Sequence, residues 1–115
     1  MSSIAKMLIE ISQTHEHKEA VLFDGETVTY GELLRTSCEL AGILSTLKLY
    51  QGDRIAILSN NSIEYIQLFY TCALFGFILV PLNYRVSVRE LEQMLLNTSP
   101  KMVVFQGLII LNAFD

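Results

Sequence analysis

The sequence predicts an α/β fold in which a β-hairpin and helices lead into a mostly parallel β-α-β-α-β sheet, part of a larger domain. The stretch 52–85 indicates this first, because two short apolar runs flank a helix-like segment in GDRIAILSNNSIEYIQLFYTCALFGFILVPLNYR. Two apolar strands joined by a helical crossover are typical of a βαβ unit, with parallel strands covered on both faces. A further amphipathic segment and a third apolar run, 102–105, continue the pattern.

The composition places the 115 residues in one domain or in part of one. Apolar residues make up 51% of the chain and charged residues 17%, whereas an average soluble domain has about 25% charged residues. This excess predicts a chain that packs against more protein. The net charge of −4 provides no basic face for phosphates, so we expect no nucleic-acid partner.

We expect neither a signal peptide nor a membrane span. The apolar opening MSSIAKMLIEIS contains Glu10, so the cytoplasm is the expected compartment. The uncharged run 68–82 is shorter than the roughly 20 residues of a spanning helix, and it contains Gly76 and Pro81. A buried helix that leads into a buried strand explains this run better.

Residues 2–14 predict an amphipathic helix, whose apolar face comprises Ile4, Met7, Leu8 and Ile11. His15 and His17 follow it, but no third or fourth metal ligand accompanies them. We therefore interpret these histidines as a solvated helix end. Cys38 and Cys72 form no CxxC pattern and fall inside predicted helices, so they are interpreted as buried free thiols.

A hairpin and a long helix are predicted next. Two β-prone runs flank Asp24-Gly25 in AVLFDGETVTY, a strong two-residue turn signal. Thr29 and Glu32 have the spacing of a capping box, and the helix that they open runs to about Lys48. Its apolar face comprises Leu33, Leu34, Leu40, Ala41, Leu44 and Leu47. Tyr30 is expected to pack its ring under this helix.

The second half of the chain repeats strand and helix. After the strand 54–58, Asn61 or Ser62 is expected to cap a helix with Glu64 near its positive end. We expect this helix to be buried on more than one side, because its apolar positions are Ile63, Ile66, Phe69, Tyr70 and Ala73. Gly76 ends it, and FILV, residues 77–80, follows as a fully buried strand.

The last predicted helix begins at a second capping box formed by Ser87 and Glu90. Leu91, Met94 and Leu95 face inward, and residues 97–100 end the helix before the strand 102–105. The tail 108–114 is uncharged and would promote aggregation if it were exposed. It is either a further strand packed in a dimer or the next core element of a larger domain that has been cut.

Polar residues with candidate roles are few. The six glycines stand singly, without a phosphate-binding loop. Residues 60–62, Asn-Asn-Ser, follow the carboxyl end of a strand, where ligands bind in open α/β sheets, although helix capping alone accounts for them. Asp53 and Arg54 are interpreted as a turn cap and a surface charge rather than a catalytic pair. Arg85 and Arg89 are interpreted as solvated rather than as an anion site.

The order of motifs resembles a known family. T-Y-x-E-L, G-D-R-I-A-I, N-S-x-E and P-L-N-Y-R occur in register, followed by PKMVVF. Together they resemble the amino-terminal portion of adenylate-forming acyl-CoA synthetases of the fatty-acyl, aryl or succinylbenzoate type. The matching segment runs from about Ala20 to Phe105. The resemblance implies that residues 1–115 are the amino-terminal part of a larger adenylating domain, and that the native protein is several times longer.

The resemblance also implies the chemistry of the parent enzyme. A carboxylic acid reacts with ATP, in the presence of Mg²⁺, to give an acyl adenylate and pyrophosphate, and coenzyme A then displaces AMP. The family's phosphate loop, metal-binding segment, ribose-binding aspartate and mobile lysine all lie downstream of this region. We therefore expect no catalytic, cofactor-binding or metal-binding residue in this chain. Lys101 belongs to the entry of a strand and is not the phosphate-loop lysine.

Three functional hypotheses follow. The first is a non-catalytic scaffold whose partner is the remainder of an acyl-CoA ligase. The alternative is a free-standing module that forms homo-oligomers through its exposed apolar surface or an open sheet edge. The third is a small nucleotide-binding protein that uses residues 60–62. The segment 106–115, QGLIILNAFD, departs from the family's expected continuation, so truncation, a frameshift or proteolysis is expected at that end.

Overall fold

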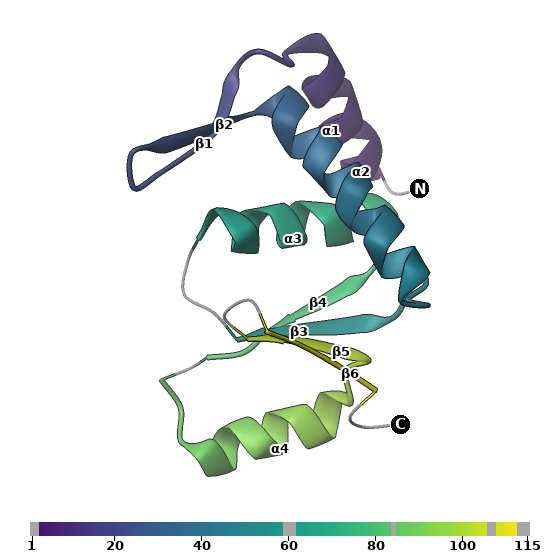
Figure 1. Ribbon diagram of the computed structural model, residues 1–115, viewed down its shortest axis with the longest axis vertical. Helices are drawn as coiled ribbons and strands as arrows, with labels where there is room; N and C mark the ends of the chain where they lie inside the picture. Colours follow the sequence, from purple (N-terminus) through teal and green to yellow (C-terminus); the bar gives the residue numbers. More distant parts are fainter. Residues whose placement is uncertain (1–2, 59–61, 84, 106–107, 113–115) are drawn as a thin grey trace.

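A computed structural model of the protein describes residues 3–58, 62–83, 85–105 and 108–112. This part of the chain contains four α-helices and six β-strands (Figure 1). In chain order they are α1 (Ser3–Thr14), β1 (Glu19–Phe23), β2 (Glu26–Thr29), α2 (Tyr30–Thr46), β3 (Arg54–Leu58), α3 (Ile63–Phe75), β4 (Ile78–Pro81), α4 (Val88–Thr98), β5 (Met102–Phe105) and β6 (Leu108–Leu111). The predicted α/β architecture is confirmed, and the sheet has one strand more than the β-α-β-α-β prediction.

The main sheet has the strand order β4-β3-β5-β6. β3 is parallel to β4 on one side and to β5 on the other, whereas β6 runs antiparallel to β5. The prediction left open whether the apolar tail is a strand packed in a dimer or the next core element of a larger domain. Within the described residues, Leu108–Leu111 extends the chain's own sheet, because Phe105 pairs with Leu108 and Met102 with Leu111. Phe114, the end of the predicted tail, lies outside the described residues.

The two faces of the sheet are covered by different helices. In Figure 1, α2 and α3 lie on one side of the sheet and α4 lies on the other. Successive side chains of a strand point to opposite faces, so Ile55 and Ile57 pack with Leu68 of α3. Ala56 packs on the other face, with Leu82 and Val103 as its buried neighbours. The half-buried residues Leu91, Met94 and Leu95 of α4 cover that second cluster, as predicted.

β4 is less buried than the sequence indicated. The predicted strand 77–80 was expected to be fully buried, but β4 begins one residue later and Ile78 is 47% exposed. The physical reason is its place at the edge of the described sheet, where it pairs with β3 alone. The uncharged run 68–82 is thus divided between α3 and β4. Among the described helices, none has the length and apolarity needed to cross a membrane.

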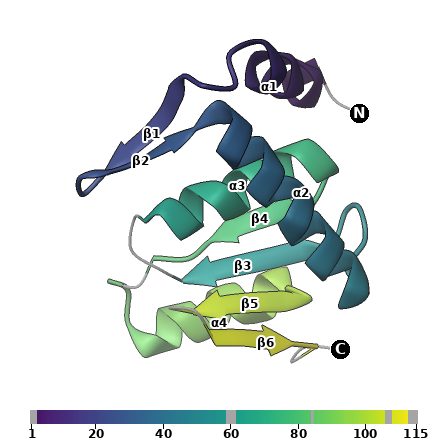
Figure 2. The same cartoon turned by 45° about the horizontal axis from the view of Figure 1, so that its top comes forward.

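The amino-terminal elements form a separate layer. Figure 2 shows the hairpin of β1 and β2 projecting beside the start of α2, away from the four-stranded sheet. β1 and β2 are antiparallel, as predicted. A second core joins this layer to α3, because Val28 and Leu33 pack with Tyr70 and Leu74. The prediction that α3 is buried on more than one side is therefore confirmed, although Phe69 is 54% exposed and Ile66 is exposed as well.

The predicted apolar face of α1 was partly wrong. Ile4 and Met7 are exposed, whereas Ala5 and Ser12 are buried. The difference arises because α1 packs against both α2 and α3, and small side chains allow helices to approach closely. The Ser12 hydroxyl lies 2.6 Å from the hydroxyl of Tyr70, which also donates to the carbonyl oxygen of Leu8 at 3.1 Å. These hydrogen bonds of Tyr70, here called the Tyr70 anchor, orient α1. The apolar pattern of the sequence does not reveal them.

The predicted helix boundaries are largely confirmed. Thr29 and Glu32 form the complete capping box of α2, and the hydroxyls of Ser62 and Ser87 accept the capping hydrogen bonds of α3 and α4. Gly76 ends α3 with φ of 80°, a left-handed conformation that glycine adopts without steric cost.

The Tyr70 anchor generates a stability prediction. Tyr70→Phe should lower the free energy of unfolding by about 1–3 kcal/mol, because the buried Ser12 hydroxyl would lose its partner. The measurement is urea unfolding followed by circular dichroism. Tyr50→Phe is the matched control, since Tyr50 is 60% exposed, and it should change stability by less than about 0.5 kcal/mol. Equal effects of the two substitutions would contradict the anchoring role of Tyr70.

Candidate functional site

The carboxyl ends of β3, β4 and β5 lie at one edge of the sheet, because these strands are parallel. Ligands bind at this edge in open α/β sheets. Ser62 is half-buried there, and its hydroxyl accepts a hydrogen bond from the backbone N–H of Tyr65 at 3.1 Å. Its role as a helix cap is therefore confirmed. Asn60 and Asn61 lie outside the described residues, so a ligand-binding role for them remains a prediction.

The loop after β4 reaches the same edge. Leu82 is buried and its backbone N–H donates to the carbonyl oxygen of Ile57 at 2.9 Å. The side-chain oxygen of Asn83 accepts from the backbone N–H of Arg85 at 2.9 Å and so stabilises the turn. Arg85 and Arg89 are both exposed. Their interpretation as solvated side chains rather than as an anion site remains a prediction.

The opposite edge, at the amino ends of the parallel strands, carries a polar cluster of Tyr50, Asp53 and Lys101. The Asp53 carboxylate accepts from the Tyr50 backbone N–H at 2.6 Å and lies 3.5 Å from the Lys101 ammonium. Lys101 also donates to the carbonyl oxygen of Lys48 at 2.7 Å and lies 5.4 Å from the centre of the Tyr50 ring. These contacts join the start of β5 to the turn that precedes β3.

The neighbouring Arg54 makes a separate contact. The Arg54 guanidinium donates to the carbonyl oxygen of Thr98 at 3.2 Å, so Asp53 and Arg54 bond to different parts of the chain. The prediction of a turn cap and a surface charge is confirmed. Sequence reasoning assigned Lys101 to the entry of a strand but missed its contacts, because Asp53 and Lys48 are distant in the sequence.

The histidines do not come together as a metal site. His15 and His17 are both exposed. The His15 ring lies 2.9 Å from the Thr14 hydroxyl, and His17 lies 3.3 Å from the carboxylate of Glu16. Over the ranges that the structure describes, no group of three or more His, Cys, Asp or Glu residues could hold a metal ion. The solvated helix end predicted for this segment agrees with these contacts.

The two cysteines differ in burial, and the prediction that Cys38 is buried was wrong. Cys72 is buried, and the loss of solvent around its thiol raises its pKa to about 12. Cys38 is exposed, contrary to the expectation of a buried thiol. The reason is helical geometry, because α2 buries Leu33, Ser37 and Leu44 and the position after Ser37 points away from that face. Both thiols are free.

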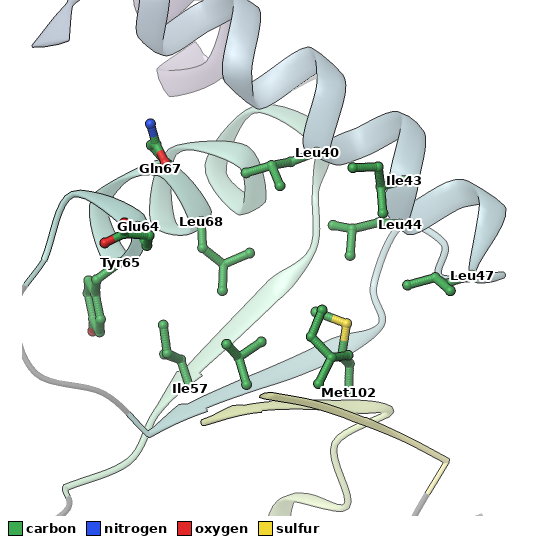
Figure 3. A pocket seen from close by; sticks show the side chains of 12 residues that line it. Leu40, Ile43, Leu44, Leu47, Ile57, Glu64, Tyr65, Gln67, Leu68 and Met102 are labelled. Carbon is green, nitrogen blue, oxygen red and sulfur yellow. The ribbon is translucent and has the colours of Figure 1, made fainter. Parts of the chain in front are cut away.

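An apolar cavity of about 220 Å³ lies between α2, α3 and one face of the sheet (Figure 3). Sequence reasoning missed it, because its apolar side chains have the pattern of ordinary core residues. The incomplete filling of the space between two helices and a sheet has no signal in the sequence. The cavity is lined by Leu40, Ile43, Leu44, Leu47, Ile57, Glu64, Tyr65, Gln67, Leu68, Met102, Val104 and Ile109.

Residues 9–113 match the family model described as AMP-binding enzyme. The chain belongs to this family. The 2-succinylbenzoate–CoA ligase of Oceanobacillus iheyensis is 42% identical over 88 residues, which are 76% of this chain and 18% of that ligase. The chain therefore spans less than a fifth of the length of this curated relative.

Solved structures of similar proteins share the fold. The fatty acyl CoA synthetase of Mycobacterium tuberculosis is similar with a TM-score of 0.82 and 29% identity, over 89% of this chain and 21% of that one. The amino-terminal subdomain of NpsA from Klebsiella oxytoca, in complex with 3-hydroxybenzoyl-AMSN, has a TM-score of 0.82 and 26% identity, over 89% and 26% of the two chains. The chain thus corresponds to part of an amino-terminal subdomain.

The described residues have three buried polar side chains, Ser12, Ser37 and Thr71. Each of their hydroxyls has a hydrogen-bond partner within the protein. The prediction that this chain contributes no catalytic residue remains a prediction.

The cysteine environments generate a chemical prediction. At pH 8, iodoacetamide should modify Cys38 at least about tenfold faster than Cys72, because the thiolate is the nucleophile. The raised pKa of Cys72 also makes the stability of the fold depend on pH. Its stabilising contribution is fully present below pH 9.0, the ordinary pKa of a thiol, and is lost as the pH rises towards 12. Mass spectrometry should find one adduct on the native protein and two in urea.

Cys38→Ser provides the control for this measurement, and native Cys38→Ser protein should stay unmodified. Rapid modification of Cys72 in that folded variant would contradict the burial of its thiol.

Proposed function

We propose that residues 1–115 form the amino-terminal part of the large domain of an acyl-CoA ligase, where they serve as a scaffold. The match of residues 9–113 to the AMP-binding enzyme family carries this proposal. The whole enzyme would activate a carboxylic acid with ATP as an acyl adenylate and transfer the acyl group to coenzyme A. Mg²⁺ would be bound by the remainder of that enzyme, which is also the expected partner of this chain.

The exposed apolar surface supports a scaffold role. Phe69 and Phe75 of α3 are 54% and 39% exposed, and Ile78 of β4 is 47% exposed. β4 also offers an unpaired edge in the described sheet. Large apolar side chains next to an open strand edge favour contact with further protein. In the proposed enzyme, the remainder of the large domain covers this surface.

The scaffold proposal predicts that the isolated 115-residue chain catalyses no acid-dependent ATP–pyrophosphate exchange. The reason is that the chain spans 18% of the length of the Oceanobacillus iheyensis ligase, and the resemblance places the family's phosphate loop, metal-binding segment, ribose-binding aspartate and mobile lysine downstream of it. Exchange should be measured with succinylbenzoate, fatty and aryl acids as substrates. The Oceanobacillus iheyensis ligase is the positive control under the same conditions. Exchange activity that co-elutes with the pure folded chain would contradict the proposal.

The same apolar surface favours a second candidate function, a module that associates with itself. In the described sheet, β4 and β6 both lie at an edge, and the side chains of Ile109 and Ile110 on β6 are 49% and 43% exposed. An uncharged open strand is a template for pairing with another chain. Sedimentation velocity over a range of concentrations separates the candidates, since a monomer at every concentration would count against self-association.

A further inference from the structure

The cavity between α2, α3 and the sheet has no role in the proposed scaffold. Its inner wall consists of Leu44, Ile57, Leu68 and Met102, which are 3%, 3%, 7% and 2% exposed. Figure 3 shows Leu44 approaching from α2 and Leu68 from α3, above Ile57 and Met102 on the sheet. These four residues come from four elements, so any occupant would contact both helices and two strands at once.

The size of the cavity suits a small organic molecule. Its volume is about 220 Å³, whereas an apolar cavity of about 150 Å³ already binds benzene. Ile43 and Ile109 line the cavity and are 54% and 49% exposed, so they lie at its rim and leave a route for entry. Met102 adds an adaptable side chain that can follow the shape of different occupants.

The chemistry of the walls excludes water as the natural occupant. A buried water makes about three hydrogen bonds to polar groups, but the inner wall consists of hydrocarbon and thioether groups. The polar lining residues Glu64, Tyr65 and Gln67 all lie in the first turns of α3, on one side of the cavity. In Figure 3 the Gln67 amide points away from Ile57 and Met102. The side chains at the base of the cavity therefore offer a water molecule no hydrogen-bond partner.

The charge of the lining determines which ligands fit. Glu64 is the one charged residue among those that line the cavity in the described structure. A carboxylate at the base of this space, beside Leu44, Ile57, Leu68 and Met102, would find no cation and no side-chain donor, and a carboxylate near the first turns of α3 would approach the negative charge of Glu64. Burial of an unpaired charge is strongly unfavourable. The cavity thus disfavours the carboxylic acids that an acyl-CoA ligase activates.

We propose that this cavity is a binding site for a neutral, apolar molecule of about one aromatic ring. The site is separate from the activation of a carboxylic acid and does not depend on the proposed function. A ligand that binds only the folded chain raises the unfolding temperature by mass action. Because the occupant contacts α2, α3, β3 and β5, it should stabilise the main sheet and its helical layer together.

The test uses toluene and benzoate, which share a ring and differ in charge. Toluene at about ten times its dissociation constant should raise the unfolding midpoint of the 115-residue protein by about 3 °C or more. Benzoate at the same concentration should produce no shift. Equal stabilisation by both compounds would overturn the proposal, and so would the absence of any shift with toluene.

A site-resolved measurement locates the ligand. The chain has four methionines, of which Met102 lines the cavity, Met94 packs on the opposite face of the sheet and Met7 is 53% exposed. With ¹³C-methyl methionine, toluene should shift the Met102 methyl resonance and leave those of Met94 and Met7 unchanged. Met102→Leu assigns the resonance. Equal shifts at all three residues would indicate non-specific binding and overturn the proposal.

A larger side chain placed inside the cavity gives a test variant, and the same substitution at an exposed position gives its matched control. Leu68→Phe adds volume inside the cavity and should abolish the toluene-induced shift in unfolding temperature. Leu96→Phe makes the same change on the exposed side of α4 and should leave that shift intact. If Leu68→Phe fails to fold, the methionine measurement on the unchanged protein decides the question. A Met102 resonance that moves with protein concentration alone would show that a second copy covers the cavity, which also overturns the proposal.

Discussion

The pairing of β3 on both of its edges is the constraint on which the rest of this structure depends. β3 bonds to β4 and β5 as parallel neighbours, and Ile55, Ala56 and Ile57 are almost fully buried. A shift of one residue in this strand would exchange its two faces. The bulky isoleucines would then meet α4, and Ala56 would face α2 and α3. The register of β3 therefore sets the positions of three helices.

The two edges of the sheet have different roles because β3 fixes their direction. At the amino edge, Lys101 bonds to the carbonyl of Lys48 and lies beside Asp53, and these contacts close that end of the sheet. The carboxyl edge carries helix caps and exposed arginines. The apolar cavity lies on the face of the sheet that α2 and α3 cover.

Local signals in the sequence predicted most of the fold. The capping pair Thr29–Glu32 and Gly76 marked helix ends through contacts within a few residues, and the apolar runs marked β3 and β5. Features that depend on distant packing were not predictable. The apolar periodicity of α1 does not indicate that Ser12 is buried, because its burial depends on contact with the distant Tyr70. The prediction of a fully buried β4 was wrong, because the edge position of this strand depends on the strand order. The cavity depends on how two helices and a sheet meet.

Amide hydrogen exchange tests the central place of β3 most directly. The amides of Ile55, Ala56 and Ile57 should exchange only through global unfolding and should be the most protected in the chain. Amides of the hairpin β1–β2 should exchange at least about 100-fold faster, because that hairpin is a separate two-stranded sheet. Protection of the hairpin or of α1 equal to or greater than that of β3 would contradict the account.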